Sequence, residues 1–482
     1  MATAAGSEQA ALGVRGGAWG VLAPFALFLA GVSWLGLSGA PDERGFWPIL
    51  LGALVLALAL AEDRKATIDV ILKGMSQPLV ALMVMAWMSA GVLGNLLGAS
   101  GLITSLVGIA KGAHLEGGAY TAAAFAVGAL MSTSTGTSLG TILIAGPVLY
   151  PAGGALGADP AMLAGAILAG ATFGDSISPV SDTTIASSST QDADIGGTVR
   201  RRMLYAVPAG VTAFVVFLVW GGAAACAANC VAGATPTPLG AASATHIEGA
   251  VDAAPRLLPL SMLLVPAFVI VLLLNKRHML EGLLAGVVLA CLLALMTGLL
   301  TPHQLFYIDA TRFGARGLIV EGMERGVGAS VFTILLMGLA ATLEASGMLG
   351  RVVAFAQART RSQRGAEWWI VGAMSAAVLL TTHSVVAILT VGRFAKDAGS
   401  RVGLSPYRRA NLLDVTACTW PFLLPFFIPT ILAASVTASG AGFGMPRVSA
   451  LSAGLANAYS WGLLVMLLWA VTSGMGRERP TT

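Results

Sequence analysis

The chain alternates long apolar stretches with short polar connections over most of its length. About a dozen of the stretches reach or approach the roughly 20 mostly apolar residues that a membrane-spanning helix needs. Residues 63–77 instead alternate apolar and polar positions with a helical period, which predicts an amphipathic helix at the membrane surface, and residues 303–325 are its expected counterpart. The pattern as a whole predicts an all-α polytopic membrane protein with about 10–12 transmembrane segments.

The composition agrees with a membrane protein. Only 10% of the 482 residues are charged, whereas about a quarter are charged in a soluble domain. The net charge of +4 is explained by basic loops that face a cytoplasm, so we expect the lipid bilayer as a partner and no nucleic acid. Residues 136–140 match the G-x-S-x-G pattern of hydrolases, but that pattern requires a strand before the serine. We therefore expect neither an enzyme nor a cofactor.

The second half of the chain repeats the first. Sliding the sequence against itself by 246 positions aligns glycines and prolines without a gap, and identities at these residues indicate shared backbone geometry. The aligned pairs are Gly101 with Gly347, Gly146 with Gly392, Gly157 with Gly403, Pro160 with Pro406, Pro179 with Pro425, and also Ser138 with Ser384. These identities predict an internal duplication.

The charges predict that the two copies have opposite orientations. Residues 351–364 carry four arginines, whereas the equivalent residues 105–118 carry one lysine and one glutamate. The positive-inside rule places the first segment inside the cell, the second outside, and both chain termini in the cytoplasm. Inverted-topology repeats are the architecture of secondary transporters, in which the substrate site lies near the membrane midplane at discontinuous helices.

The repeats divide the chain into five predicted parts. These are an N-terminal segment with the first transmembrane helix (1–45), transport repeat 1 (46–202), linking helices with a periplasmic loop (203–278), transport repeat 2 (279–435), and a C-terminal transmembrane helix with its tail (436–482). Cys226 and Cys230 lie in the predicted periplasmic loop. Their spacing fits a local disulfide or two buried thiols, and the sequence does not decide between them.

Each repeat contains two places where a helix is expected to break. In repeat 1, the hydroxyl-rich residues 131–140 separate two apolar stretches of about fifteen residues, which are short for full spans and predict a re-entrant hairpin. Pro179 interrupts the following helix. Residues 381–386 and 418–425 are the equivalent places in repeat 2. Because non-helical backbone is costly in lipid, we expect these breaks to line a cavity in the protein.

The break at Pro179 carries two acids. Asp175 and Asp182 flank this proline, and no lysine or arginine lies within residues 171–191 to neutralise them. A buried carboxylate must be paired, coordinate a cation or bind a proton. We therefore predict that Asp175 and Asp182 bind Na⁺ or a proton. The other candidate residues for the ion or substrate site are Thr135, Thr137, Ser138, Ser178, Thr183, Thr184, His383, Ser384, Asn411 and Asp414.

Several of these residues also have a simpler interpretation. Any single serine or threonine at a break can cap a free helix end instead of binding an ion. His383 is the only histidine predicted at membrane depth, and it could sense protons or serve as a hydrogen-bonded structural residue. Asn411 and Asp414 share one helical face. They could belong to the site or be solvated cytoplasmic residues beside Arg408 and Arg409.

The sequence GDSISPVSDTT (residues 174–184) resembles the signature of the NhaC-type sodium/proton antiporters, a family of the ion transporter superfamily. A looser resemblance covers residues 386–414. The resemblance implies that Asp175, Ser178, Asp182, Thr183 and Thr184 form the ion site. The chain departs from its relatives at His383 and at Asp414–Val415, where they commonly have an asparagine and an acidic pair. The family also includes members proposed to exchange organic acids.

Two modes of transport fit these features. In the first, Na⁺ is exchanged for H⁺ across the bacterial inner membrane by alternating access, because both ions compete for carboxylates whose charged form is disfavoured away from water. In the alternative, transport of a small organic acid or amino acid is coupled to Na⁺ or H⁺, and helix N-termini bind the anion. A monovalent cation is the expected small-molecule partner, and formation of a homodimer is left open.

Overall fold

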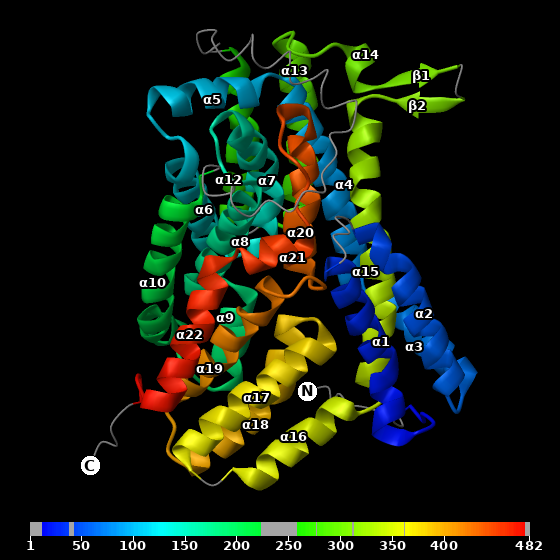
Figure 1. Ribbon diagram of the computed structural model, residues 1–482, viewed down its shortest axis with the longest axis vertical. Coiled ribbons are helices and arrows are strands. Elements are labelled where there is room, and N and C mark those ends of the chain that lie inside the picture. The colour runs from blue at the N-terminus through cyan, green and yellow to red at the C-terminus, as the bar shows by residue number, and fades with distance from the viewer. Residues whose placement is uncertain are drawn as a thin grey trace.

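The computed structural model describes residues 12–37, 43–222, 258–275, 277–310, 313–360 and 362–477. These residues form helices almost throughout (Figure 1), so the predicted all-α class is confirmed. Seven described helices are long and apolar enough to cross a membrane, and five shorter apolar segments accompany them. The chain is a polytopic membrane protein. Cys226 and Cys230, whose pairing the sequence leaves open, lie outside the described residues.

The elements are as follows. The chain begins with α1 (Gly17–Leu37), η1 (Glu43–Gly45), α2 (Phe46–Leu60) and α3 (Arg64–Met75). It continues with α4 (Pro78–Ala99), α5 (Leu102–Gly112), α6 (Gly117–Thr135), α7 (Ser138–Ala155), α8 (Pro160–Ile177), α9 (Asp182–Thr190) and α10 (Ile195–Trp220). Next come η3 (Leu258–Leu263), α12 (Leu264–Leu274), α13 (Met279–Met296), α14 (Pro302–Leu305) and the antiparallel strands β1 (Tyr307–Asp309) and β2 (Gly314–Arg316).

The rest of the chain repeats the pattern of α4–α9. It contains α15 (Leu318–Ala345), α16 (Met348–Arg359), α17 (Gln363–Thr381), α18 (Ser384–Arg401), α19 (Pro406–Ala417), η4 (Trp420–Phe422), α20 (Ile428–Val436), η5 (Thr437–Phe443), α21 (Ala450–Leu455) and α22 (Ala458–Ser473). Under the shift of 246 positions, α6, α7 and α9 coincide with α17, α18 and α20 at both ends. The helix boundaries therefore follow the duplication that the glycines and prolines predict.

Equivalent segments of the two copies lie at opposite ends of the molecule. Figure 1 shows α5 and the α6–α7 hairpin at one end, and α16 and the α17–α18 hairpin at the other. Gly101 and Gly347, with φ of 81° and 69°, turn the chain before α5 and α16 in the same way. Glycine adopts this left-handed conformation without the steric cost of a Cβ atom. Equal local geometry in opposite orientations is what an inverted repeat requires.

The breaks lie where the sequence predicts them. The turns between hairpin helices contain Gly136 and Thr382, both with positive φ. The first proline break separates α8 from α9, and the second extends from the end of α19 to the start of α20. The hairpin helices have 19 and 18 residues in both copies, so they are longer than the expected fifteen.

One of the two predicted surface helices is wrong. Residues 64–75 form α3, but residues 303–325 do not form a single helix. The first turn after Thr301 is closed by a capping box between Thr301 and Gln304. Residues 307–309 then pair with residues 314–316 as the antiparallel strands β1 and β2 before α15 begins. A capped turn and a β-hairpin thus take the place of a counterpart to α3.

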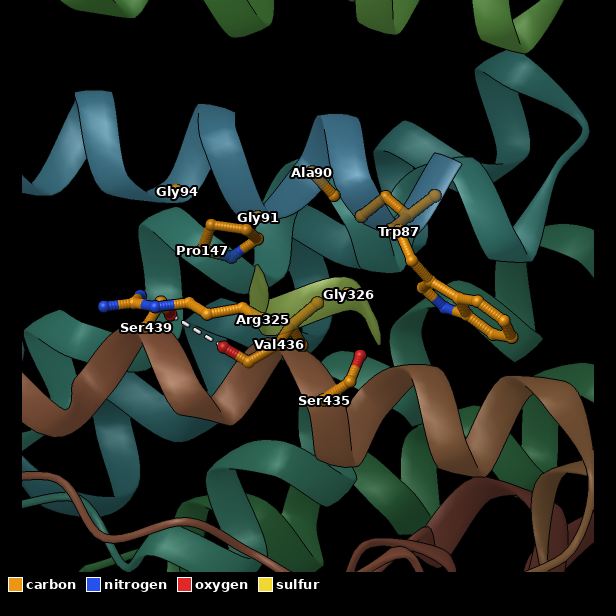
Figure 2. Close-up of a pocket in the computed structure, with 11 residues that line it drawn as sticks. Trp87, Ala90, Gly91, Gly94, Pro147, Arg325, Gly326, Ser435, Val436 and Ser439 are labelled. Atoms are coloured by element: carbon orange, nitrogen blue, oxygen red, sulfur yellow. Dashed lines mark hydrogen bonds between the residues drawn. The ribbon is translucent and has the colours of Figure 1, made fainter. Parts of the chain in front are cut away.

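Glycines allow α4 and α15 to pack with their backbones in contact. A Cβ atom added to Gly91 of α4 would lie 2.1 Å from the carbonyl oxygen of Gly322, and one added to Gly326 would lie 2.8 Å from the backbone nitrogen of Met88. Small residues at helix interfaces permit this close approach in membranes. Where this pair meets α7 and α20, a pocket of about 30 Å³ remains beside Arg325 (Figure 2). It has room for about one water molecule.

A buried carboxylate joins α22 to the second hairpin. Glu367 of α17 is 0% exposed, and Arg408 of α19 donates from Nε to its Oε1 at 2.8 Å. Arg477, after the end of α22, donates from Nη2 to Oε2 at 2.6 Å. Arg408 also donates from Nη2 to the carbonyl of Ala470 in α22. One charge cluster therefore ties α17, α19 and α22 together.

The packing of α4 on α15 predicts the effect of adding a single methyl group. We expect Gly91→Ala to lower the stability of the purified protein by about 1–3 kcal/mol, because the new Cβ overpacks a backbone contact. Gly52→Ala is the matched control, since Gly52 lies within helix α2 and a Cβ there meets nothing within 4 Å. The control should be neutral or stabilising by up to about 1 kcal/mol. Thermal unfolding in detergent measures both, and equal midpoints would contradict the packing argument.

Candidate ion-binding site

Both hairpin turns and both breaks line one cavity of about 620 Å³. Residues 134–139 of the first hairpin face residues 382–385 of the second across this space, and residues 180–183 of the first break lie beside them. Pro421 and Phe422 come from the second break. The duplication therefore brings segments that are far apart in the sequence to a single site, as expected for broken helices in an inverted repeat.

Asp175 is the most enclosed acid on the cavity wall. It lies near the end of α8 and is 7% exposed. Ser138 Oγ, from the start of α7, donates to its Oδ2 at 3.0 Å, and Ser181 Oγ donates to its Oδ1 at 2.6 Å. None of the ion pairs among the described residues involves this carboxylate. Asp175 is thus stabilised by hydroxyl groups and lacks a basic partner in the described chain.

Asp182 supplies a second carboxylate to the same space. It is the first residue of α9, it lines the cavity, and its side chain is exposed there. No ion pair within the described ranges contains it either. Two acids without a permanent positive partner attract a proton or a small cation.

The other cavity-lining candidates act at least partly as helix caps. Thr137 Oγ1 accepts a hydrogen bond from Gly140 N at 3.2 Å, and His383 Nδ1 accepts one from Val386 N at 3.5 Å. Thr137 and His383 are equivalent under the 246-residue shift, so each caps the returning helix of its hairpin. Both side chains therefore cap a helix and also lie on the cavity wall. The other predicted residues that line the cavity are Thr135, Ser138, Thr183 and Ser384.

Four predicted residues do not line the cavity. These residues are Ser178, Thr184, Asn411 and Asp414. Asp414 is 0% exposed and forms an ion pair with Arg202, while Asn411 Oδ1 accepts from Arg202 Nε at 3.0 Å. The alternative that Asn411 and Asp414 are solvated cytoplasmic residues is therefore wrong, because both are buried.

Arg202 is the main residue that the sequence reasoning missed. It directly follows Arg200 and Arg201, which are exposed, but it is itself buried. Arg202 shares a buried face of α10 with Thr198, Tyr205 and Ala209. The helical period of that face could have distinguished it from its two neighbours. Ser181, which donates to Asp175, was also left out of the candidate residues.

The connection between α12 and α13 brings basic residues to the cavity. Arg277 and His278 both line it. Arg277 Nη1 lies 3.8 Å from Glu281 Oε1 one turn along α13, and both side chains are largely exposed. An exposed pair of this kind contributes little to stability. The cavity wall therefore includes an arginine whose charge is not buried.

A cavity bounded by two hairpins and two broken helices is the arrangement expected of a secondary transporter built from inverted repeats. Residues 24–222 match the model of the Na⁺/H⁺ antiporter family. The match covers less than half of the chain. It includes the first hairpin, Asp175 and Asp182, whereas the second repeat lies beyond the match.

Individual proteins are similar to shorter segments of the chain. The chain is 32% identical over 169 residues to a malate-2H⁺/Na⁺-lactate antiporter of Bacillus subtilis, covering 35% of this chain and 36% of that protein. It is 38% identical over 92 residues to the Na⁺/H⁺ antiporter NhaC of Alkalihalophilus pseudofirmus, covering 19% and 20%. An uncharacterized Na⁺/H⁺ antiporter of Haemophilus influenzae is 34% identical over 93 residues, with the same coverage. The matches thus span about a third of the first relative and a fifth of the other two.

The geometry of the cavity can be tested by thiol accessibility. In a variant whose native cysteines are replaced by alanine, Ser134→Cys should react with a water-soluble maleimide, because Ser134 is exposed on the cavity wall. Ser187→Cys is the matched control, since Ser187 is 0% exposed and lies outside the wall. We expect labelling rates that differ by at least about tenfold, because reaction requires an accessible thiolate. Equal rates would show that the cavity is closed or wrongly bounded.

Proposed function

We propose that the chain is a secondary antiporter that exchanges Na⁺ for H⁺ across the bacterial inner membrane, with both termini in the cytoplasm. The observation that carries this proposal is the environment of Asp175. Its two carboxylate oxygens accept hydrogen bonds from Ser138 and Ser181, and no basic side chain pairs with it among the described residues. A buried acid in this situation gains stability by taking up a proton or a cation.

Competition between the two ions supplies the coupling. Asp175 and Asp182 can be neutralised by protons or share a sodium ion, and occupancy by one ion disfavours the other. Hydroxyl oxygens of Thr137 and Thr183 lie on the same wall and can add neutral ligands. Sodium is a hard cation that prefers such oxygen ligands. A site built in this way binds either ion from whichever side of the membrane it faces.

Alternating access follows from the inverted repeats. Two copies of one fold in opposite orientations allow the site to face each side of the membrane in turn, when one bundle moves against the other. The close packing of α4 on α15 makes this pair a candidate for the fixed bundle. The hairpins and broken helices, which carry the site, then form the moving bundle. Lipid and a monovalent cation are the partners that this mechanism requires.

Asp175→Asn tests the function in proteoliposomes that contain a pH-sensitive dye. The amide can keep the hydrogen bonds with the two serines in part, but it cannot neutralise a cation. We expect sodium-driven proton flux to fall by about two orders of magnitude, since removing one partner of a buried charge pair costs about 3–5 kcal/mol. Asp182→Asn should reduce the flux in the same direction.

Asp69→Asn is the control for this experiment. Asp69 is an exposed acid of α3, far along the chain from both breaks. Its replacement should leave the flux unchanged. Sodium-driven proton flux that persists in Asp175→Asn and Asp182→Asn would refute the proposal.

The dimensions of the cavity favour a second candidate function. About 620 Å³ lies within the roughly 300–1,000 Å³ of small-molecule sites and exceeds what a bare ion needs. Arg277, His278 and His383 on its wall could bind a carboxylate. The Bacillus subtilis relative is named as an antiporter of malate and lactate. The second candidate is therefore cation-coupled antiport of a small organic acid.

Counterflow of radiolabelled malate or lactate distinguishes the two functions. If the chain exchanges only Na⁺ and H⁺, vesicles loaded with unlabelled acid should accumulate no more label than vesicles with Asp175→Asn. Saturable accumulation would establish the second function. In that case we expect Arg277→Gln to weaken the apparent affinity by about tenfold, since a charge-assisted hydrogen bond contributes about 1.5–3 kcal/mol.

A further inference from the structure

A single buried arginine holds the first break in place. Arg202 of α10 is 1% exposed and pairs with Asp414 of α19 through Nη2. Its Nη1 donates to the carbonyl of Ser176, near the end of α8, and to Thr184 Oγ1, near the start of α9, both at 2.7 Å. One guanidinium group thus contacts both half-helices that flank the break.

The chemistry of the contacts suits an arginine. The guanidinium is planar, always charged, and offers several donors in a fixed fork. The Ser176 carbonyl lies at the C-terminal end of α8, where the helix dipole is negative and attracts a cation. Asn411 Oδ1 accepts from Nε at 3.0 Å and completes the set. Asp414 then balances the charge, so the cluster is neutral as a unit.

Hydrogen-bonding side chains connect this cluster to the cavity. Cys418 Sγ lies 3.4 Å from Asp414 Oδ1 and 3.9 Å from Thr183 Oγ1. Thr183 Oγ1 is 3.1 Å from Ser181 Oγ, which donates to Asp175. The ion pair therefore lies behind the acids of the cavity, close enough for its charges to act on a bound ion.

We propose that Arg202 and Asp414 are a positioning pair that fixes the two half-helices of the first break and keeps the charge behind the cation site at zero. This inference rests on the proposed function, because it concerns the affinity of the same site for Na⁺. It gives Asp414 and Asn411 a role that does not require contact with the ion. Asp175 and Asp182 alone then supply the net charge of the Na⁺ site.

Neutralising one member of the pair at a time should change the KM for Na⁺ in opposite directions. Arg202→Gln leaves the charge of Asp414 uncompensated, which attracts a cation and lowers the KM for Na⁺. Asp414→Asn leaves the charge of Arg202 uncompensated, which repels a cation and raises the KM. A full charge acting through protein of effective dielectric about 20 changes an ion-binding constant by on the order of tenfold. The double variant Arg202→Gln/Asp414→Asn should lie between the two single variants.

The experiment is a Na⁺ titration of exchange in proteoliposomes at fixed pH, with Na⁺-dependent thermal stabilisation of the purified protein as a readout of binding. Arg200→Gln, an exposed arginine on the same helix, is the matched control and should not change the KM. Arg202→Lys keeps the charge and should stay within about threefold of the wild-type KM, while loss of the fork lowers the unfolding midpoint.

A shared direction of change in the two single variants, or no change in either, overturns the proposal, since a merely structural pair gives no opposite shifts. If one single variant does not fold, the other is compared with the double variant. The KM of Arg202→Gln must then be lower than that of the double variant, or the KM of Asp414→Asn must be higher. If neither folds, an Arg202→Lys protein whose KM changes by tenfold or more overturns the proposal. Wild-type protein without Na⁺-dependent exchange or stabilisation would refute the proposed function itself. If the wild-type protein exchanges normally but the KM values of the two single variants do not shift in opposite directions, only the positioning pair is refuted.

Discussion

Every helix that ends inside a membrane must find partners for its free backbone groups, and this constraint organises the centre of the molecule. Thr137 and His383 satisfy amides at the starts of the two returning hairpin helices. Ser384 Oγ donates to the carbonyl of Ala417, at the end of α19, and Arg202 donates to that of Ser176. The polar residues that line the cavity are thus needed first to end helices there. The proposed ion site uses the same residues, because capping leaves oxygen atoms directed at a shared space.

The two central acids differ in what compensates their charge. Asp414 has a fixed partner in Arg202, whereas in the described part of the chain Asp175 has only the hydroxyl groups of Ser138 and Ser181. A permanently paired carboxylate gains little from a cation, because its charge is already compensated. A carboxylate that accepts hydrogen bonds only from neutral groups keeps an uncompensated negative charge, so it still attracts a cation or a proton. In the proposed mechanism, a structural acid therefore differs from an ion-binding acid in its counter-charge, which cannot be inferred from residue type alone.

The sequence predicts the fold better than the site. Gly101 and Gly347 impose backbone geometry locally, so a register found from such residues carries over to the helix boundaries. The burial of the Arg202 side chain depends on its partners Asp414 and Asn411, which are distant in the sequence. A run of three arginines satisfies the positive-inside rule whichever of them faces the core. The prediction for residues 303–325 failed for another reason, since their expected equivalence to residues 63–77 does not hold where a capped turn and a β-hairpin precede α15.

The cluster around Glu367 has a consequence for how the protein is made. Glu367 lies in α17, whereas its partners Arg408 and Arg477 follow it in the sequence by 41 and 110 residues. During translation this carboxylate is therefore made before either arginine that compensates it. Until both arginines are present it must be protonated or in contact with water, because a buried charge without a partner is costly. The second hairpin can reach its final packing only after Arg477 has been made.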